Sequence, residues 1–102
     1  MNSPLSSSEI RHLFEAAVLS GDKAKLKILV AINSDKNNKM IEDDIKNLTG
    51  IEKNDLMKSI EFLSEAHYIE TMMEDIPGRS PHKVCILTED GKKILGIFGV
   101  ED

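Results

Sequence analysis

The sequence predicts one mostly α-helical domain that carries a two-stranded β-hairpin near its C-terminal end, an α+β fold. Two observations predict it. Apolar residues recur at helical spacing through the first two thirds of the chain, and short runs of bulky residues then flank a Pro-Gly turn. With 102 residues, 40% of them hydrophobic and 30% charged, the chain suffices for one core. We therefore expect residues 1–102 to form a single domain.

The first predicted helix spans about residues 6–20. Ser6 and Glu9 have the spacing of a capping box, and Ser20-Gly21 ends the pattern. Its apolar positions share one face. We expect this extra helix either to cover the same core or to pack against a second subunit. The candidate residues of a homodimer interface are Ile10, Leu13, Phe14 and Val18.

The remaining helices and the hairpin belong to a core at about residues 22–95. The helix at 22–33, for which Asp22 is the expected cap, is apolar on more than one side and should be buried at the centre. In the helix at 41–48 we expect three apolar side chains to face inwards, and in the helix at 53–66 another three. These two sets are Ile41, Ile45 and Leu48, and Leu56, Ile60 and Leu63. Thr49-Gly50 separates the two helices.

The pattern changes after this helical region. Residues 68–74 and 83–88 are predicted as strands, and the connection between them contains Pro77-Gly78, a pair suited to a type II turn. Thr88 is placed to cap a last helix at about 89–98. Its two glycines, Gly91 and Gly96, make that helix weak.

Nothing in the sequence indicates a membrane or an oxidising compartment. The longest near-apolar run, residues 26–32, holds seven residues, whereas a membrane span needs roughly 20. The N-terminus lacks the basic and apolar regions of a secretory signal. The single cysteine, Cys85, forms no internal disulfide and is expected to be a small core residue. We expect a cytoplasmic protein with no membrane partner.

The order of helix, helix, Gly-containing turn, helix and hairpin carries a specific resemblance. Residues 48–70 resemble the turn and recognition helix of winged helix-turn-helix regulators of bacteria and archaea. Residues 78–95, with Gly-Arg, then Lys-Val, then Leu-Thr-Glu-Asp-Gly, resemble the wing and following helix of MarR-like and PadR-like regulators. The resemblance covers about residues 23–95 and implies a DNA-binding transcriptional regulator.

The resemblance, together with the helical pattern, singles out two sets of candidate DNA-binding residues. On the recognition helix they are Lys53, Asn54, Met57, Lys58 and Ser59. Lysine suits phosphate or guanine, asparagine suits adenine, and methionine suits a thymine methyl group. On the wing they are Arg79, His82 and Lys83, which would contact the backbone or the minor groove.

Charge is the feature that fits DNA least well. The chain carries a net charge of −5, and residues 40–70 alone hold three lysines against eight acidic residues. DNA-binding proteins usually present a positive balance, overall or on one face. Asp55 also stands where the family often has Ser or Thr, and Glu52 makes a poor helix cap. The alternative is therefore a winged helix that binds a basic protein partner through its acidic helix-turn-helix.

Other chemistry is not indicated. Cys85 and His82, at i and i+3 near a strand, point to opposite faces, and His12 and His67 lie elsewhere. A role at the helix end is expected for His67. The acids at 42–44 lack the glycine and alternating ligands of a calcium loop and fit the first turn of a helix. We expect no metal, no cofactor and no enzymatic activity.

Overall fold

The computed structural model describes residues 23–75, 77–78 and 80–97. The predicted helix at 6–20, and with it the candidate interface residues Ile10, Leu13, Phe14 and Val18, lies outside the described residues. Arg79 also lies outside them. Within the described part the elements are α2 (Lys23–Asn33), β1 (Lys39–Ile41), α3 (Glu42–Thr49), α4 (Lys53–Glu65), β2 (Ile69–Glu74), β3 (His82–Leu87) and α5 (Glu89–Ile97).

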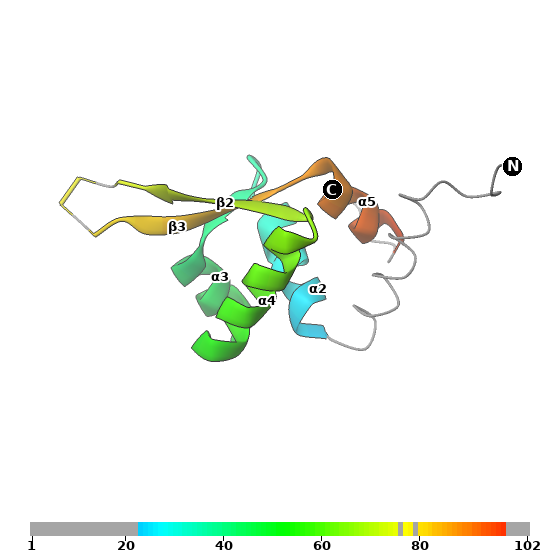
Figure 1. Ribbon diagram of the computed structural model, residues 1–102, viewed down its shortest axis with the longest axis horizontal. Helices are drawn as coiled ribbons and strands as arrows, with labels where there is room; N and C mark the ends of the chain where they lie inside the picture. The colour runs from blue at the N-terminus through cyan, green and yellow to red at the C-terminus, as the bar shows by residue number, and fades with distance from the viewer. Residues whose placement is uncertain (1–22, 76, 79, 98–102) are drawn as a thin grey trace, which may run out of the picture.

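The predicted order of helices and hairpin is confirmed, with bounds that agree to within one or two residues. One strand was not predicted. The short β1 pairs with β3 in antiparallel register, Met40 opposite Cys85, so that the sheet has the order β1-β3-β2. The β2–β3 hairpin extends past α3 and α4 as a wing (Figure 1). At its turn Gly78 has a φ of +79°, the value that the third position of a type II turn requires.

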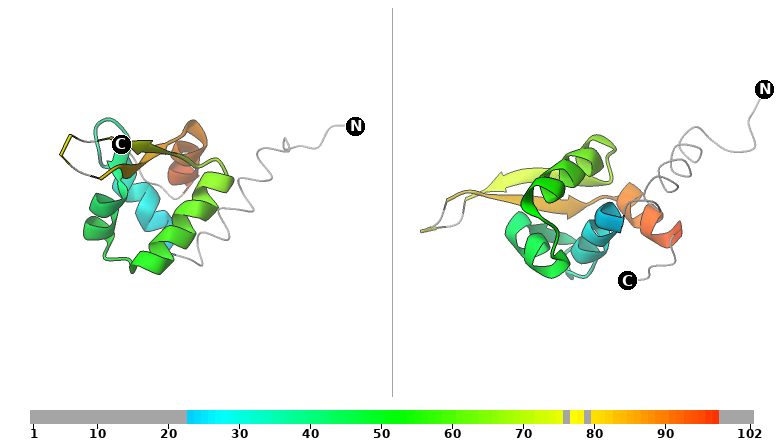
Figure 2. Two further views of the ribbon diagram at one scale, coloured as in Figure 1. Left: turned by 60° about the vertical axis from the view of Figure 1, so that its left-hand side comes forward. Right: turned by 90° about the horizontal axis from the view of Figure 1, so that it is seen from below.

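Helix α2 is the centre of the core, as its sequence predicts. Ile28, Leu29 and Ile32 are 0% exposed, and α2 packs against α3, α4, α5 and β3. Seen from below, it lies between the α3–α4 pair and α5 (Figure 2). These contacts fix α4 against the rest of the domain and leave its outer face uncovered by described residues.

Two apolar side chains expected in the core lie outside it. Leu48 is 63% exposed, and Val30, which belongs to the helix at 22–33 that was expected to be buried, is 38% exposed. Both line an open cleft of about 620 Å³ between α2 and the end of α3, together with Leu26, Ala31 and others. Helix α3 has eight residues, or about two turns, and Ile45 is its one buried residue. The last turn of α3, which carries Leu48, therefore lies at the edge of the core and not within it.

Thr88 forms the junction between the sheet and α5. Its Oγ1 atom accepts a hydrogen bond from the Gly91 N–H at 3.1 Å, so that Thr88 caps α5 as predicted. The same hydroxyl lies 2.7 Å from the His67 carbonyl oxygen and 2.9 Å from that of Tyr68. Gly91 is buried against this junction, since a Cβ there would collide with the Tyr68 carbonyl and the Leu87 side chain.

Candidate nucleic-acid interface

The turn between α3 and α4 is held by glycine and threonine. Gly50 adopts the left-handed conformation, with φ +71°, and its N–H donates to the Lys46 carbonyl at 2.9 Å. The Thr49 hydroxyl donates to the Ile45 carbonyl at 2.7 Å and accepts from the Ile51 N–H at 3.3 Å. Glu52 then precedes α4 without a side-chain cap, as its residue type predicts. This geometry makes α3, the turn and α4 a helix-turn-helix.

Helix α4 has one buried and one exposed face. Leu56, Ile60 and Leu63 are buried as predicted. The candidate DNA-contacting residues Lys53, Asn54 and Lys58 are exposed, and Met57 is 47% exposed. They extend from the start of the helix along the side turned away from the core. Four of the five predicted recognition-helix residues therefore lie on an accessible face.

Ser59 is the exception, and placing it among the outward residues was wrong. It is 5% exposed. Ser59 lies three residues after Leu56 and four before Leu63, so it shares their face of the helix. The side chain lines a groove between α4 and α2. Direct reading of a base edge by Ser59 is excluded by this position.

On one side of α4, two adjoining clefts separate the helix from the wing. Their volumes are about 330 and 200 Å³, and Met57 and Lys83 line both of them. Lys83 is half-buried there, and the register places it opposite Met73 in the hairpin. The candidate His82 has its Nδ1 atom 3.8 Å from an Asp43 carboxylate oxygen of α3. The structure thus brings Lys83 close to α4 and places His82 beside α3.

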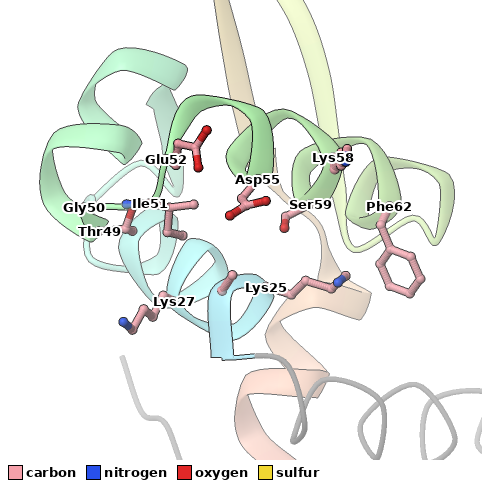
Figure 3. A pocket seen from close by; sticks show the side chains of 11 residues that line it. Lys25, Lys27, Thr49, Gly50, Ile51, Glu52, Asp55, Lys58, Ser59 and Phe62 are labelled. Atoms are coloured by element: carbon pink, nitrogen blue, oxygen red, sulfur yellow. The ribbon is translucent and has the colours of Figure 1, made fainter.

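On the other side, the α2–α4 groove has a volume of about 650 Å³. It is lined by Ala24, Lys25, Lys27, Thr49, Gly50, Ile51, Glu52, Asp55, Lys58, Ser59 and Phe62. Figure 3 shows the Asp55 and Ser59 oxygens pointing from α4 towards α2, with Lys25 extended along the groove. The Lys25 ammonium lies over the Phe62 ring, 4.9 Å from its centroid. The two lysines of α2 were not among the predicted site residues.

Negative charge interrupts the exposed face of α4. Glu52, Asp55, Glu61 and Glu65 are all exposed, so that neither a continuous positive stripe nor an unbroken acidic face covers the helix. Among the described residues, no ion pair joins these carboxylates to Lys53 or Lys58. The lysine charges of α4 are therefore available to a partner.

Cys85 and His67, which were considered for metal binding or catalysis, lie at positions that are explained by the fold. Cys85 is 0% exposed, and its burial raises the pKa of the thiol to about 12, as expected for a core cysteine. His67 follows Ala66, the C-cap residue of α4, and has a φ of +65°, a conformation that favours glycine. In the described part of the chain no group of three metal-ligating side chains occurs, and no helix has the length and hydrophobicity of a membrane span.

Comparison with known proteins gives a result at the level of the fold. The sequence matches no protein-family model and no curated protein. Among solved structures, it is similar to TubR bound to 24 bp of tubC from Bacillus thuringiensis serovar israelensis pBtoxis, with 18% identity, a TM-score of 0.69, and coverage of 96% of this chain and 97% of that one.

Two further solved structures are also similar, the first of them a MarR family transcriptional regulator. Sco3205 from Streptomyces coelicolor, in complex with DNA, has 19% identity and a TM-score of 0.64 over 93% of this chain and 69% of that one. BpsR from Bordetella bronchiseptica has 18% identity and a TM-score of 0.62 over 90% and 70%. These likenesses confirm the predicted winged helix-turn-helix fold.

Proposed function

We propose that this protein is a DNA-binding regulator that places α4 in the major groove and its wing on the backbone or minor groove. The observation that carries the proposal is the exposure of Lys53, Asn54 and Lys58 on the outer face of α4. Had these side chains packed against the core, a recognition helix would be excluded. The neighbours solved with DNA, TubR and Sco3205, support the same function.

Each exposed residue has a defined task in this arrangement. Asn54 offers the paired donor and acceptor that match adenine, and Lys53 and Lys58 contact guanine or phosphate. Met57, at 47% exposure, presents an apolar surface to a thymine methyl group. Lys83 contacts the backbone from the junction of α4 and the wing, with Arg79 and His82 beside it in the sequence. Binding by these groups requires no catalysis, cofactor or metal.

A homodimer on DNA completes the proposal. The predicted interface residues Ile10, Leu13, Phe14 and Val18 form one apolar face in the sequence, and two copies would place their recognition helices about one DNA turn apart. Size-exclusion chromatography with light scattering tests this. A monomer at micromolar concentration contradicts the dimer and leaves DNA binding by one copy to be tested separately.

The decisive experiment selects bound duplexes from a random pool and measures the affinity of the protein for the most enriched duplex at several salt concentrations. We expect affinity to fall with salt because phosphate contacts release counterions. Asn54→Ala and Lys53→Ala should change the selected sequence, whereas Lys83→Ala should weaken all duplexes alike. Lys36→Ala is the matched control, because Lys36 is an exposed lysine in the α2–β1 loop and lines none of the clefts beside α4.

A protein partner is the second candidate, and the exposed carboxylates of Glu52, Asp55 and Glu61 favour it. It predicts that wild-type protein binds no duplex even at low salt. It also predicts that wild type captures a basic partner, and that the variant with glutamine at these three positions does not. Binding of duplex that falls with salt, unaffected by the Lys36 control, favours DNA instead.

A further inference from the structure

We infer that the α2–α4 groove is a second phosphate-contacting surface, on the side of the recognition helix opposite the wing. The inference rests on the proposed DNA-binding function and extends it to residues of α2. The major groove is about 12 Å wide and has a sugar-phosphate backbone along each edge. A helix lying in it therefore has one backbone on either side. The wing and Lys83 face one of these, and α2 faces the other.

The lysines of α2 are placed as such a surface requires. Lys23, Lys25 and Lys27 occur within five residues at the start of the helix, and its first turn contains no acidic residue. Lys23 and Lys27 are exposed and, at i and i+4, lie on one face of α2. Lys27 lines the groove near the α3–α4 turn, and Lys58 of α4 lines it further along the helix (Figure 3). The groove is thus bordered by cations from both helices.

This arrangement is unfavourable for the helix alone. Cations at a helix N-terminus oppose the positive end of its dipole, and like charges at i and i+4 repel each other. Asp22, the predicted cap, supplies one carboxylate in the sequence and lies outside the described residues. Among the described residues no ion pair joins Lys23 or Lys27 to a carboxylate. A nearby polyanion relieves both repulsions.

Ser59 provides an independent observation inside the same groove. It is the one buried polar residue of the described chain, at 5% exposure. Its hydroxyl points towards α2 (Figure 3) and has no hydrogen-bond partner among the described residues. The hydroxyl oxygen is not fully enclosed, so that solvent or a ligand in the groove can reach it. A phosphate oxygen, or a water bound to it, would accept the hydrogen bond that Ser59 is placed to donate.

The Asp55 carboxylate also lines the groove and limits where the phosphate lies. Lys25, positioned over Phe62, lies towards the later part of α4, and Lys27 lies near the turn. The lining lysines outnumber the two carboxylates, Glu52 and Asp55, by one. We therefore place the DNA backbone over the α2 edge of the groove, nearer to Lys23 and Lys27 than to Asp55.

The test compares the Lys23→Gln/Lys27→Gln double variant with the Lys36→Gln control on one selected duplex. Both α2 lysines are exposed, so that the fold is expected to survive, and circular dichroism checks this. We expect the slope of log affinity against log salt to become less steep by about 0.9 for each phosphate that the double variant no longer neutralises. The selected sequence should stay unchanged, because phosphate contacts position the protein and do not read bases.

A second variant examines the hydroxyl. Ser59→Ala should lower affinity for the duplex about threefold to tenfold, without changing the salt slope, because the removed donor is neutral. A double lysine variant with the slope of wild type overturns the inference while leaving the proposed function intact. If the wild-type protein binds no duplex even at low salt, the proposed function itself is refuted.

Discussion

The contact between α5 and the sheet allows a sharp stability prediction at Gly91. A Cβ added there would lie closer than 3.0 Å to the Tyr68 carbonyl oxygen and 2.6 Å from Leu87 Cδ1, whereas ordinary contact begins at 3.4 Å. A rotamer change can move the leucine methyl, but the carbonyl belongs to the backbone. Gly91→Ala therefore forces α5 away from the sheet.

The size of the effect follows from three opposing contributions. Replacing glycine by alanine inside a helix normally stabilises by about 0.5–1 kcal/mol. Overpacking a filled site costs about 1–3 kcal/mol. Moving α5 also stretches the Gly91 N–H to Thr88 Oγ1 hydrogen bond, now 3.1 Å, which contributes about 1 kcal/mol. We expect the free energy of unfolding of Gly91→Ala to fall by about 2 kcal/mol, or Tm by about 10 °C.

Gly96→Ala is the matched control in the same helix. No described atom lies within 4 Å of the position of its added Cβ. Only the helix-propensity gain remains, and stability should rise by about 0.5–1 kcal/mol. Urea unfolding followed by far-ultraviolet circular dichroism measures both variants. If Gly91→Ala is as stable as Gly96→Ala, the close approach of α5 to the Tyr68 carbonyl is refuted.

The remaining predictions concern Thr88 and Cys85. Thr88→Val keeps the shape of the side chain but removes the cap of α5 and the hydrogen bond to a carbonyl oxygen at 2.7–2.9 Å. The free energy of unfolding should therefore fall by about 1–2 kcal/mol. The control Thr71→Val, at an exposed position of β2, should leave the free energy of unfolding nearly unchanged. Because the pKa of Cys85 is raised from 9.0 to about 12, a thiol reagent at mildly alkaline pH should modify the native protein far more slowly than the urea-unfolded chain, and equal rates would contradict the burial. The same shift means that the unfolded thiol ionises first, so stability from this group should decline as pH rises above 9, through about 12.

The sequence predicts the helices and the wing because their signals are local. Helical spacing of Leu56, Ile60 and Leu63, the turn at Gly50 and the cap at Thr88 each need only neighbouring residues, and all three are present. Strand β1 could not be predicted in this way. It has three residues, Lys39–Ile41, and exists through pairing with β3, which lies far along the chain beyond α3, α4 and β2.

The errors at Ser59 and Leu48 have a common physical cause. Helical spacing gives the direction of an apolar stripe, but the width of the buried face depends on which helix packs beside it. Helix α2 packs against both helices and extends the buried face of α4 to Ser59. The end of α3 runs past the core and leaves Leu48 exposed. Neither outcome is encoded within the helix that contains the residue.

Net charge is a poor guide to the partner of this protein because charge acts locally. At roughly 0.1 M salt, exposed charges more than about 10 Å apart are largely screened from each other. A negative total therefore matters less than the charges on either side of α4. Lys83 lies on the wing side, and Lys25, Lys27 and Lys58 line the α2 side.

If α4 enters the major groove as proposed, the carboxylates that remain on its outer face limit which DNA sequences the protein binds. Glu61 is exposed and lines a cleft together with Lys83. A carboxylate in the major groove accepts a hydrogen bond from the cytosine amino group and repels the acceptor atoms of guanine. If α4 binds as proposed, Glu61 therefore favours cytosine at one position, and Glu61→Gln should relax the preference at that position while raising affinity for duplexes that lack it. A selected sequence that is the same for Glu61→Gln and wild type would place this side chain outside the groove.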